Sequence, residues 1–364
     1  MFVYVATGLL VYLSLKKYEE AKSNELVHKK KSLSIFYKYL AIVILTLVFG
    51  LRAYSVGTDT KNYLLIFDSL GSDFIFEKMI YEKGFCILSI FSRRYFGSFT
   101  ALLLISGFII YWNIITSICE LSQSPSISML CFFGLGAFAQ SCNLLRQYLA
   151  LSFCLIAMLF LIKKNKNLLF ILYVLIAFLF HRSAIVFLIL LPLKHIKFNI
   201  RNIFLFLVGT ALAIVFLPYL LKFFDRISGS HYYTYITIRS ETLSLVNIGV
   251  IVILSIVLFF ILKFRRQVNK EESVKEYDIY ANMFLLFFCL IIVSIFSAEL
   301  VDRIAIYFLP AVYFLLPMIL KTFKDYKSKF FVYMLAIVFL IFLVYILKFR
   351  GTYEILPYDF VRLF

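Results

Sequence analysis

Charged side chains are scarce in this chain. They make up 16% of its 364 residues, whereas apolar residues make up 63%, and the mean hydropathy is +0.95. A soluble globular protein carries about 25% charged and about 45–50% apolar residues. The composition therefore excludes a soluble fold and predicts an all-α polytopic membrane protein, because a helix satisfies its own backbone polar groups in lipid.

The sequence also lacks the motifs of common soluble enzymes. It contains no Walker A motif, no GxSxG elbow, no HExxH and no dinucleotide-binding glycine pattern. The six cysteines are scattered, without CxxC spacing, which argues against a zinc site and a disulfide-stabilised ectodomain. We therefore expect no cofactor, no metal and no coupling to ATP within the chain.

Apolar runs separated by short polar breaks predict about 11–12 membrane crossings in one integral membrane domain covering residues 1–364. The runs are Phe2–Leu15, Phe36–Leu51, Ser98–Ile118, Ser126–Ser141, Leu145–Ile162, Leu168–Phe180, Ser183–Leu193, Ile203–Leu221, Leu245–Leu262, Ile279–Ser297, Ile304–Leu320 and Phe330–Leu347. The sixth and seventh are too short to span upright, so we interpret them as half-helices meeting near a cavity at Arg182.

Lysines indicate the orientation. If all twelve runs cross, the lysine-rich loops fall on one side, which the positive-inside rule makes cytoplasmic. Both termini then lie outside. The net charge of +17 follows mainly from this anchoring, and we predict no nucleic-acid partner.

Arginines are distributed differently. With the same topology most of them fall on the external side: Arg52, Arg93, Arg94, Arg146, Arg182, Arg226, Arg239, Arg303, Arg350 and Arg362. Guanidinium groups stay charged and bind phosphate bidentately. The set predicts an external anion site, and lipid-headgroup contact is the alternative for any one arginine.

Three external segments, the loops 52–97 and 222–244 and the tail 348–364, frame this predicted site. In the first, Gly57 precedes Asp59, which is either a helix cap or a functional carboxylate. Glu82 precedes a stretch that predicts an interfacial or re-entrant helix, and the same two interpretations apply to it. We expect the aromatic, amphipathic tail to fold back over the site.

Arg146 and Gln147 begin the crossing that starts at Leu145. An arginine there opposes the helix dipole, so its value lies in binding an anion at the helix end. His181 occupies the break between the two half-helices, where it could act as a base, a substrate ligand or a plug for broken-helix carbonyls.

Two later external segments are also polar. The first holds Asp225, Arg226, His231, three tyrosines and Arg239, and the second begins a crossing with Asp302 and Arg303. The tyrosines suit either sugar stacking or an interfacial aromatic belt.

The ordered set of these motifs resembles the EpsG family of Wzy-type polysaccharide polymerases, from about residue 36 to residue 320. The residues that carry the resemblance are Arg52, Gly57–Asp59, Tyr63, Glu82-Lys83-Gly84-Phe85, Leu145-Arg146-Gln147, His181-Arg182-Ser183-Ala184, Asp302-Arg303 and Tyr307.

The resemblance implies a GT-C-like glycosyltransferase of exopolysaccharide or O-antigen biosynthesis in the bacterial cytoplasmic (inner) membrane. Such enzymes move a growing glycan from undecaprenyl diphosphate to the non-reducing end of the next lipid-linked repeat unit, at the external leaflet. A flippase and a chain-length regulator are the implied protein partners.

Candidate roles follow from that chemistry. Charge develops on the departing diphosphate, where preorganised arginines stabilise it. Arg146 is the first candidate, with Arg52 and Arg303 beside it, and Arg226 and Arg239 as further diphosphate ligands. A base must accept the proton of the attacking hydroxyl. The candidates are His181, Asp59 and Glu82, with His181 favoured. Gln147, Tyr63, His231 and Asp302 are candidate substrate-binding residues. We expect direct inverting transfer without a metal.

Three other functions remain open. A lipid-linked oligosaccharide flippase or transporter would line a central path with charge and show internal repeats, of which we find none. An O-antigen ligase would use the same donor but carries one large external domain. An acyltransferase would place its histidine nearer the cytoplasmic side.

Overall fold

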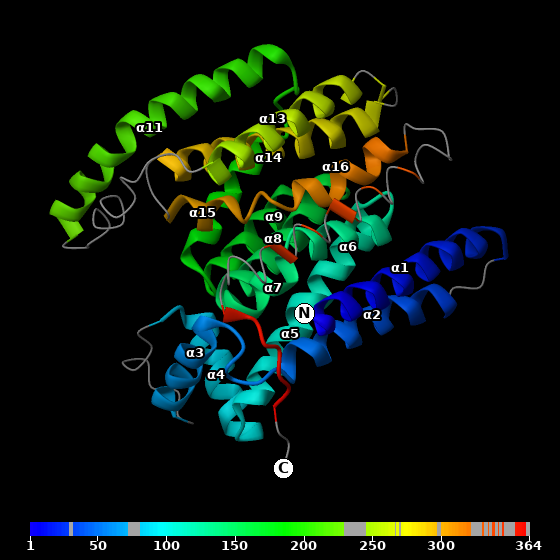
Figure 1. The fold of residues 1–364 in the computed structure, drawn as a ribbon, viewed down its shortest axis with the longest axis vertical. Coiled ribbons are helices and arrows are strands. Elements are labelled where there is room, and N and C mark those ends of the chain that lie inside the picture. Colours follow the sequence, from blue (N-terminus) through cyan, green and yellow to red (C-terminus); the bar gives the residue numbers. More distant parts are fainter. Residues whose placement is uncertain are drawn as a thin grey trace. The chain divides into compact units, whose positions relative to one another are not determined.

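The computed structural model describes most of the chain. The described residues are 1–28, 32–71, 81–228, 245–265, 267–268, 271–296, 300–321, 330, 334, 337–338, 341, 344–345 and 354–361. Their regular elements are helices (Figure 1). One isolated β-bridge pairs Arg52 with Phe360. The predicted all-α polytopic membrane fold is confirmed.

The chain forms two compact units. The first comprises Met1–Ile185 with Phe323–Phe364, and the second comprises Val186–Thr322. Each is described by itself here, and the prediction of one membrane domain stays a prediction.

The first unit is built on packed apolar helices. Helix α1 (Phe2–His28) packs on α2 (Ser32–Gly50), and α2 packs on α5 (Phe99–Leu121). Helix α5 in turn contacts α8 (Leu145–Ile162), which packs on α9 (Asn167–Phe178). Helix α8 is the most enclosed of these, with 78% of its span buried, so its first turn is held by neighbours on several sides.

The run Ser126–Ser141 does not form the single straight crossing that we predicted. It divides into α6 (Pro125–Gly134) and α7 (Ala137–Asn143), which meet at an angle of 59°. Gly136 has φ +75° at the junction, a left-handed conformation that glycine adopts without steric cost. The pair is a broken span or a re-entrant loop, and it ends directly before α8.

Two short helices follow α2. Helix α3 (Thr58–Leu70) buries Tyr63 and Phe67, and α4 (Lys83–Phe96) buries Phe85 and Ile90, while other faces of both remain exposed. The helix predicted after Glu82 is therefore confirmed. The break predicted near Arg182 is confirmed as well. Helix α9 ends at Phe178, and a 3₁₀ segment, η2 (Arg182–Ile189), continues into α10 (Leu190–Leu193).

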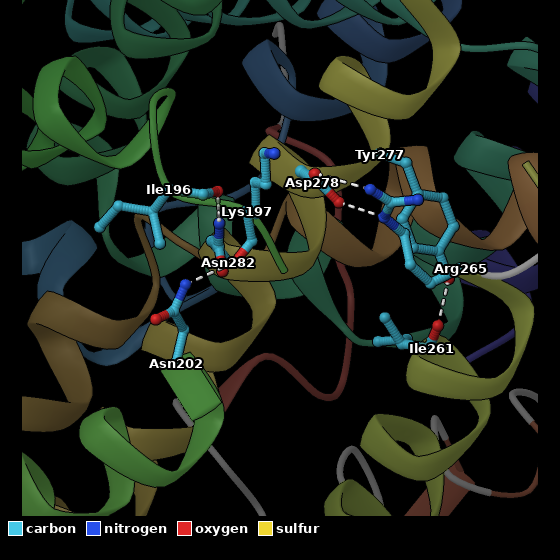
Figure 2. A network of polar contacts seen from close by, with 8 residues as sticks. All are labelled: Ile196, Lys197, Asn202, Ile261, Arg265, Tyr277, Asp278 and Asn282. Atoms are coloured by element: carbon cyan, nitrogen blue, oxygen red, sulfur yellow. Dashed lines mark hydrogen bonds and ion pairs between the residues drawn. The ribbon is translucent and has the colours of Figure 1, made fainter. Parts of the chain in front are cut away.

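The second unit is arranged around one helix. Helix α14 (Glu271–Phe296) contacts α11 (Ile200–Ser228), α13 (Leu245–Arg265), α15 (Leu300–Ala305) and α16 (Ala311–Leu320). Figure 2 shows a polar network within this unit, in which Asp278 of α14 pairs with Arg265 of α13 and Asn282 donates to the Ile196 carbonyl. The sequence analysis did not single out this network.

Six described helices are long and apolar enough to cross a membrane: Leu33–Gly50, Phe99–Leu121, Leu145–Ile162, Ile200–Tyr219, Ile248–Arg265 and Ser273–Phe296. The bent pair α6–α7 would make a seventh. The predicted count of 11–12 is larger because it includes the shorter apolar helices Asn167–Phe178, Arg182–Leu193 and Ala311–Leu320. It also includes Phe2–Leu15, which is the apolar first half of α1 and is followed by a charged second half. The last predicted run, Phe330–Leu347, lies largely outside the described residues.

Candidate active site

A polar pocket lies in the first unit. Its volume is about 220 Å³, and it is lined by Tyr81, Glu82, Arg146 and Arg182. Three element starts supply the charged groups. Glu82 is the N-cap position of α4, Arg146 is the second residue of α8, and Arg182 is the first residue of η2. Two guanidinium groups thus face one carboxylate, so the pocket is cationic overall.

The Glu82 carboxylate connects two of the sequence-predicted residues. Its Oε2 accepts a charge-assisted hydrogen bond from Arg146 Nη1, and its Oε1 lies 3.2 Å from His181 Nδ1. The Glu82 side chain is only 11% exposed. Burial alone would raise the pKa of this carboxyl, but the His181 hydrogen bond and the Arg146 charge outweigh burial and lower the pKa to about 2. Glu82 is therefore ionised at neutral pH.

A close backbone approach explains how Glu82 and His181 meet. The Gly84 N–H donates to the Leu179 carbonyl at 2.8 Å, which ties the start of α4 to the end of α9. A Cβ at Gly84 would lie 2.7 Å from that carbonyl oxygen, which is closer than real Cβ contacts allow. The Glu82-Lys83-Gly84 motif thus needs its glycine so that the carboxylate can reach His181.

Arg146 is held between aromatic rings. Its guanidinium lies 5.7 Å from the Tyr63 ring centroid and 5.2 Å from that of Tyr81, both within cation–π range. Burial raises the pKa of Tyr63, so its hydroxyl stays neutral beside the arginine. The Arg146 Nε is buried without a hydrogen-bond partner. The guanidinium therefore has a hydrogen-bond donor, Nε–H, that is not bonded to Glu82.

Asp59 and Arg52 have other surroundings. Asp59 lies in the first turn of α3, where its backbone N–H donates to Asn143 Oδ1 at 2.8 Å. Gly57 precedes it with φ +94°, so the predicted tight turn is confirmed. Arg52 is fully buried and donates to the Phe49 and Cys142 carbonyls at 2.5 and 3.0 Å. Neither residue lines the pocket, and their predicted catalytic and diphosphate-binding roles stay predictions.

The other candidates lie elsewhere. Gln147 is buried in α8 and does not line the pocket. Asp302 and Arg303 belong to α15 of the second unit, where Arg303 is exposed. His231, Arg239 and the side chain of Arg226 lie outside the described residues. Among the residues that the structure describes, no three His, Cys, Asp or Glu side chains form a metal-binding group.

Of the pocket residues, Tyr81 was not predicted from the sequence, and Arg182 was predicted only as one arginine of the expected anion site. Arg182 could have been assigned to the site more specifically, because it stands next to His181 at the helix break. Tyr81 carried no signal apart from its position beside Glu82. Asn143, whose side chain organises the start of α3, was not predicted either, although it stands three residues before Arg146.

Comparison with known proteins places the chain in a family. The model of the EpsG family matches residues 35–360. Neither a search of curated proteins nor a search of solved structures gave a match. The matched region covers nearly the whole chain and includes every residue of the pocket. The chain therefore belongs to the EpsG family.

Proposed function

We propose that this protein is a membrane glycosyltransferase that extends a polysaccharide by one lipid-linked repeat unit at a time. The EpsG family suggests a polysaccharide polymerase-type function, and the apolar helices fit a multi-pass membrane protein. The donor in this proposal is the growing glycan on undecaprenyl diphosphate, and the acceptor is the next lipid-linked unit. The reaction takes place at the external face of the bacterial inner membrane.

One observation carries the proposal. The pocket is lined by two arginines and a carboxylate that pairs with His181, and these four groups come from three separate parts of the sequence. Transfer from a lipid diphosphate needs cations at the leaving group and a base at the attacking hydroxyl. The pocket of about 220 Å³ supplies the cations, and His181 is paired with the Glu82 carboxylate that lines it.

The arginines act on the leaving group. As the bond between the anomeric carbon and the diphosphate oxygen breaks, the electron pair and its negative charge go to the diphosphate. Arg146 and Arg182 would bind that charge where it grows. Because Glu82 and the Tyr63 and Tyr81 rings fix the Arg146 guanidinium, little reorganisation is needed during the reaction, which is the main source of electrostatic catalysis.

His181 acts as the base in this proposal. Ionised Glu82 accepts a hydrogen bond from the imidazole Nδ1–H, and this hydrogen bond favours the tautomer whose Nε2 carries no proton. Nε2 would accept the proton of the sugar hydroxyl as the hydroxyl oxygen attacks the anomeric carbon. Glu82 thus orients the base and holds Arg146 with its other oxygen. Attack opposite the leaving group inverts the anomeric centre.

The test is polymerisation by the purified protein. It would be reconstituted in liposomes with its synthetic undecaprenyl-diphosphate repeat unit and no nucleotide, and the products would be resolved on a gel. A ladder of regularly spaced glycans is the expected result. A single transferred unit with added lipopolysaccharide core would instead indicate a ligase. Movement of the unit across the bilayer without any new glycosidic bond would indicate a transporter, and either outcome would overturn the proposal.

A further inference from the structure

We infer that Arg52, Asn143 and the C-terminal segment 354–361 are positioning elements for Arg146. This inference rests on the proposed function, because it assigns these residues a part in placing the arginine that would bind the diphosphate. None of the three lines the pocket, so each would act through the backbone that carries Arg146.

The C-terminal segment, red in Figure 1, pairs with the loop after α2. The Ala53 N–H donates to the Asp359 carbonyl, and the Val361 N–H donates to the Leu51 carbonyl, both at 2.8 Å. These two bonds form the isolated antiparallel bridge between Arg52 and Phe360. At the other end of the segment, the Gly57 N–H donates to the Glu354 carbonyl at 3.1 Å. The loop 51–57 is thus held by backbone bonds along its length.

Side chains anchor the same segment to the helices. The Tyr358 hydroxyl donates to the Val48 carbonyl in α2, and the Tyr4 hydroxyl donates to the Ile355 carbonyl at 3.3 Å. The Tyr4 and Tyr358 rings pack edge to face at 5.2 Å. The segment therefore lies in a defined place against α1 and α2.

The Arg52 side chain connects this loop to the end of α7. Its guanidinium is fully buried, stacks on the Phe49 ring at 4.1 Å, and links the Phe49 carbonyl to the Cys142 carbonyl. A buried cation is costly unless its donors are satisfied, and the Arg52 Nε has no partner. An apolar side chain would avoid the buried charge but would break the link between the Phe49 and Cys142 carbonyls.

Asn143 supplies the second link. Its Oδ1 accepts from Thr58 Oγ1 at 3.0 Å and from the Asp59 N–H at 2.8 Å, which satisfies a donor at the start of α3. Cys142 and Asn143 precede Arg146 by a few residues, with Leu144 as the only residue between α7 and α8. The two linked positions therefore fix the backbone from which the Arg146 side chain extends into the pocket.

The first measurement is hydrogen exchange of the peptide 137–148 in the full-length protein. Arg52→Gln and Asn143→Ala should speed exchange there about tenfold, because each releases one link. Asn143→Asp keeps the acceptor oxygen and should restore slow exchange. Arg93→Gln is the matched control. Arg93 also stacks on a phenylalanine, Phe67, and bonds an acceptor, Asp68. Within the described part of the chain it makes no hydrogen bond to Cys142 or Asn143. Unchanged exchange in Arg52→Gln and Asn143→Ala would overturn the inference, whether or not the protein polymerises glycans.

The second measurement separates positioning from plain stability. In the wild-type background, Asn143→Ala should lower kcat about 10²-fold, the scale of a misplacement of about 1 Å. In the Arg146→Ala background the same substitution should change the residual rate less than about twofold, because the arginine that Asn143 positions is absent. Equal effects in both backgrounds would overturn the inference. Faster exchange combined with no ladder from the wild type would instead leave the links established and overturn the proposed function.

Discussion

Each of the two units contains a pair between an arginine and a carboxylate, and the two pairs are built differently. In the second unit, Arg265 Nε donates to Asp278 Oδ1, and Arg265 Nη2 donates to Asp278 Oδ2 at 3.0 Å (Figure 2). One arginine thus binds both oxygens of the carboxylate. In the first unit, Glu82 divides its oxygens between Arg146 and His181.

The difference extends to the surroundings. Near the Arg265–Asp278 pair, Tyr277 donates to the Ile261 carbonyl at 2.6 Å and Asn282 to the Ile196 carbonyl at 2.6 Å, so side chains of α14 tie it to α13 and to the segment after α10. The Arg146–Glu82 pair instead borders a pocket that also contains Arg182. A bidentate pair suits a fixed structural link, whereas a monodentate pair beside a cavity leaves guanidinium donors for an anion. We therefore expect the two pairs to respond differently to substitution.

The largest expected effect comes from replacing Arg146, and Arg265 is replaced in a separate variant for comparison. Arg146→Ala should lower the polymerisation rate about 10³-fold, close to 4 kcal/mol of transition-state stabilisation, because a preorganised cation is lost from the leaving group. Arg265→Ala should leave the rate of the folded fraction unchanged and lower the unfolding temperature. Initial rates from the ladder assay, normalised to folded protein, measure both. Equal losses of rate would remove the distinction between the pairs.

The next effect is the pH dependence of stability. Because the pKa of Glu82 is lowered from 4.5 to about 2 in the folded protein, its ionised form stabilises the fold by about 3 kcal/mol at neutral pH. This contribution is complete above pH 4.5 and is lost as the pH falls through about 2. Glu82→Gln should therefore unfold at a lower temperature than the wild type at pH 7, and the gap should narrow steadily below pH 4.5. A gap independent of pH would show that the Glu82 charge does not contribute.

A somewhat smaller effect is expected for the base. His181→Ala should lower kcat about 10²-fold while the affinity for the lipid diphosphate changes little, because the proton acceptor is lost but the arginines remain. Single-turnover rates and equilibrium binding would separate the two quantities. A loss of binding equal to the loss of rate would assign His181 to substrate contact instead.

The smallest effect tests the backbone approach behind the pair. Gly84→Ala places a Cβ 2.7 Å from the Leu179 carbonyl, so the start of α4 must move and carry Glu82 away from His181. We expect about a tenfold loss of rate. Gly209→Ala is the control, because a Cβ there meets no atom within 4 Å. If the two alanine variants are equally active, the pocket tolerates displacement of α4.

Much of the first unit could be predicted from the sequence. The arginines and the polar breaks at Glu82, Arg146 and His181 identified residues that the fold brings together, because charge is rare in this apolar chain and stands out. The long-range contacts could not be predicted. Nothing in the sequence pairs Ala53 with Asp359, or Arg52 with the Cys142 carbonyl, since such bonds depend on tertiary packing. For the same reason the sequence did not show that the Arg52 guanidinium is enclosed by the protein, and its diphosphate-binding role stays a prediction.

The polar network of α14 was missed for a related reason. Arg265 and Asp278 are ordinary residues of a charged loop region in the sequence, and only the packing of α13 against α14 turns them into a bidentate pair. The bend at Gly136 was missed because the hydropathy of the run Ser126–Ser141 is continuous across the break. Hydropathy reports burial in lipid, not the direction of the helix axis.

The central claim is that the pocket lined by Tyr81, Glu82, Arg146 and Arg182 binds the lipid diphosphate. Its most direct test is equilibrium binding of undecaprenyl diphosphate to the protein in nanodiscs, for the wild type, Arg146→Ala and Arg265→Ala. We expect similar affinity for the wild type and Arg265→Ala, and affinity at least about tenfold weaker for Arg146→Ala. Undiminished binding to folded Arg146→Ala would contradict it.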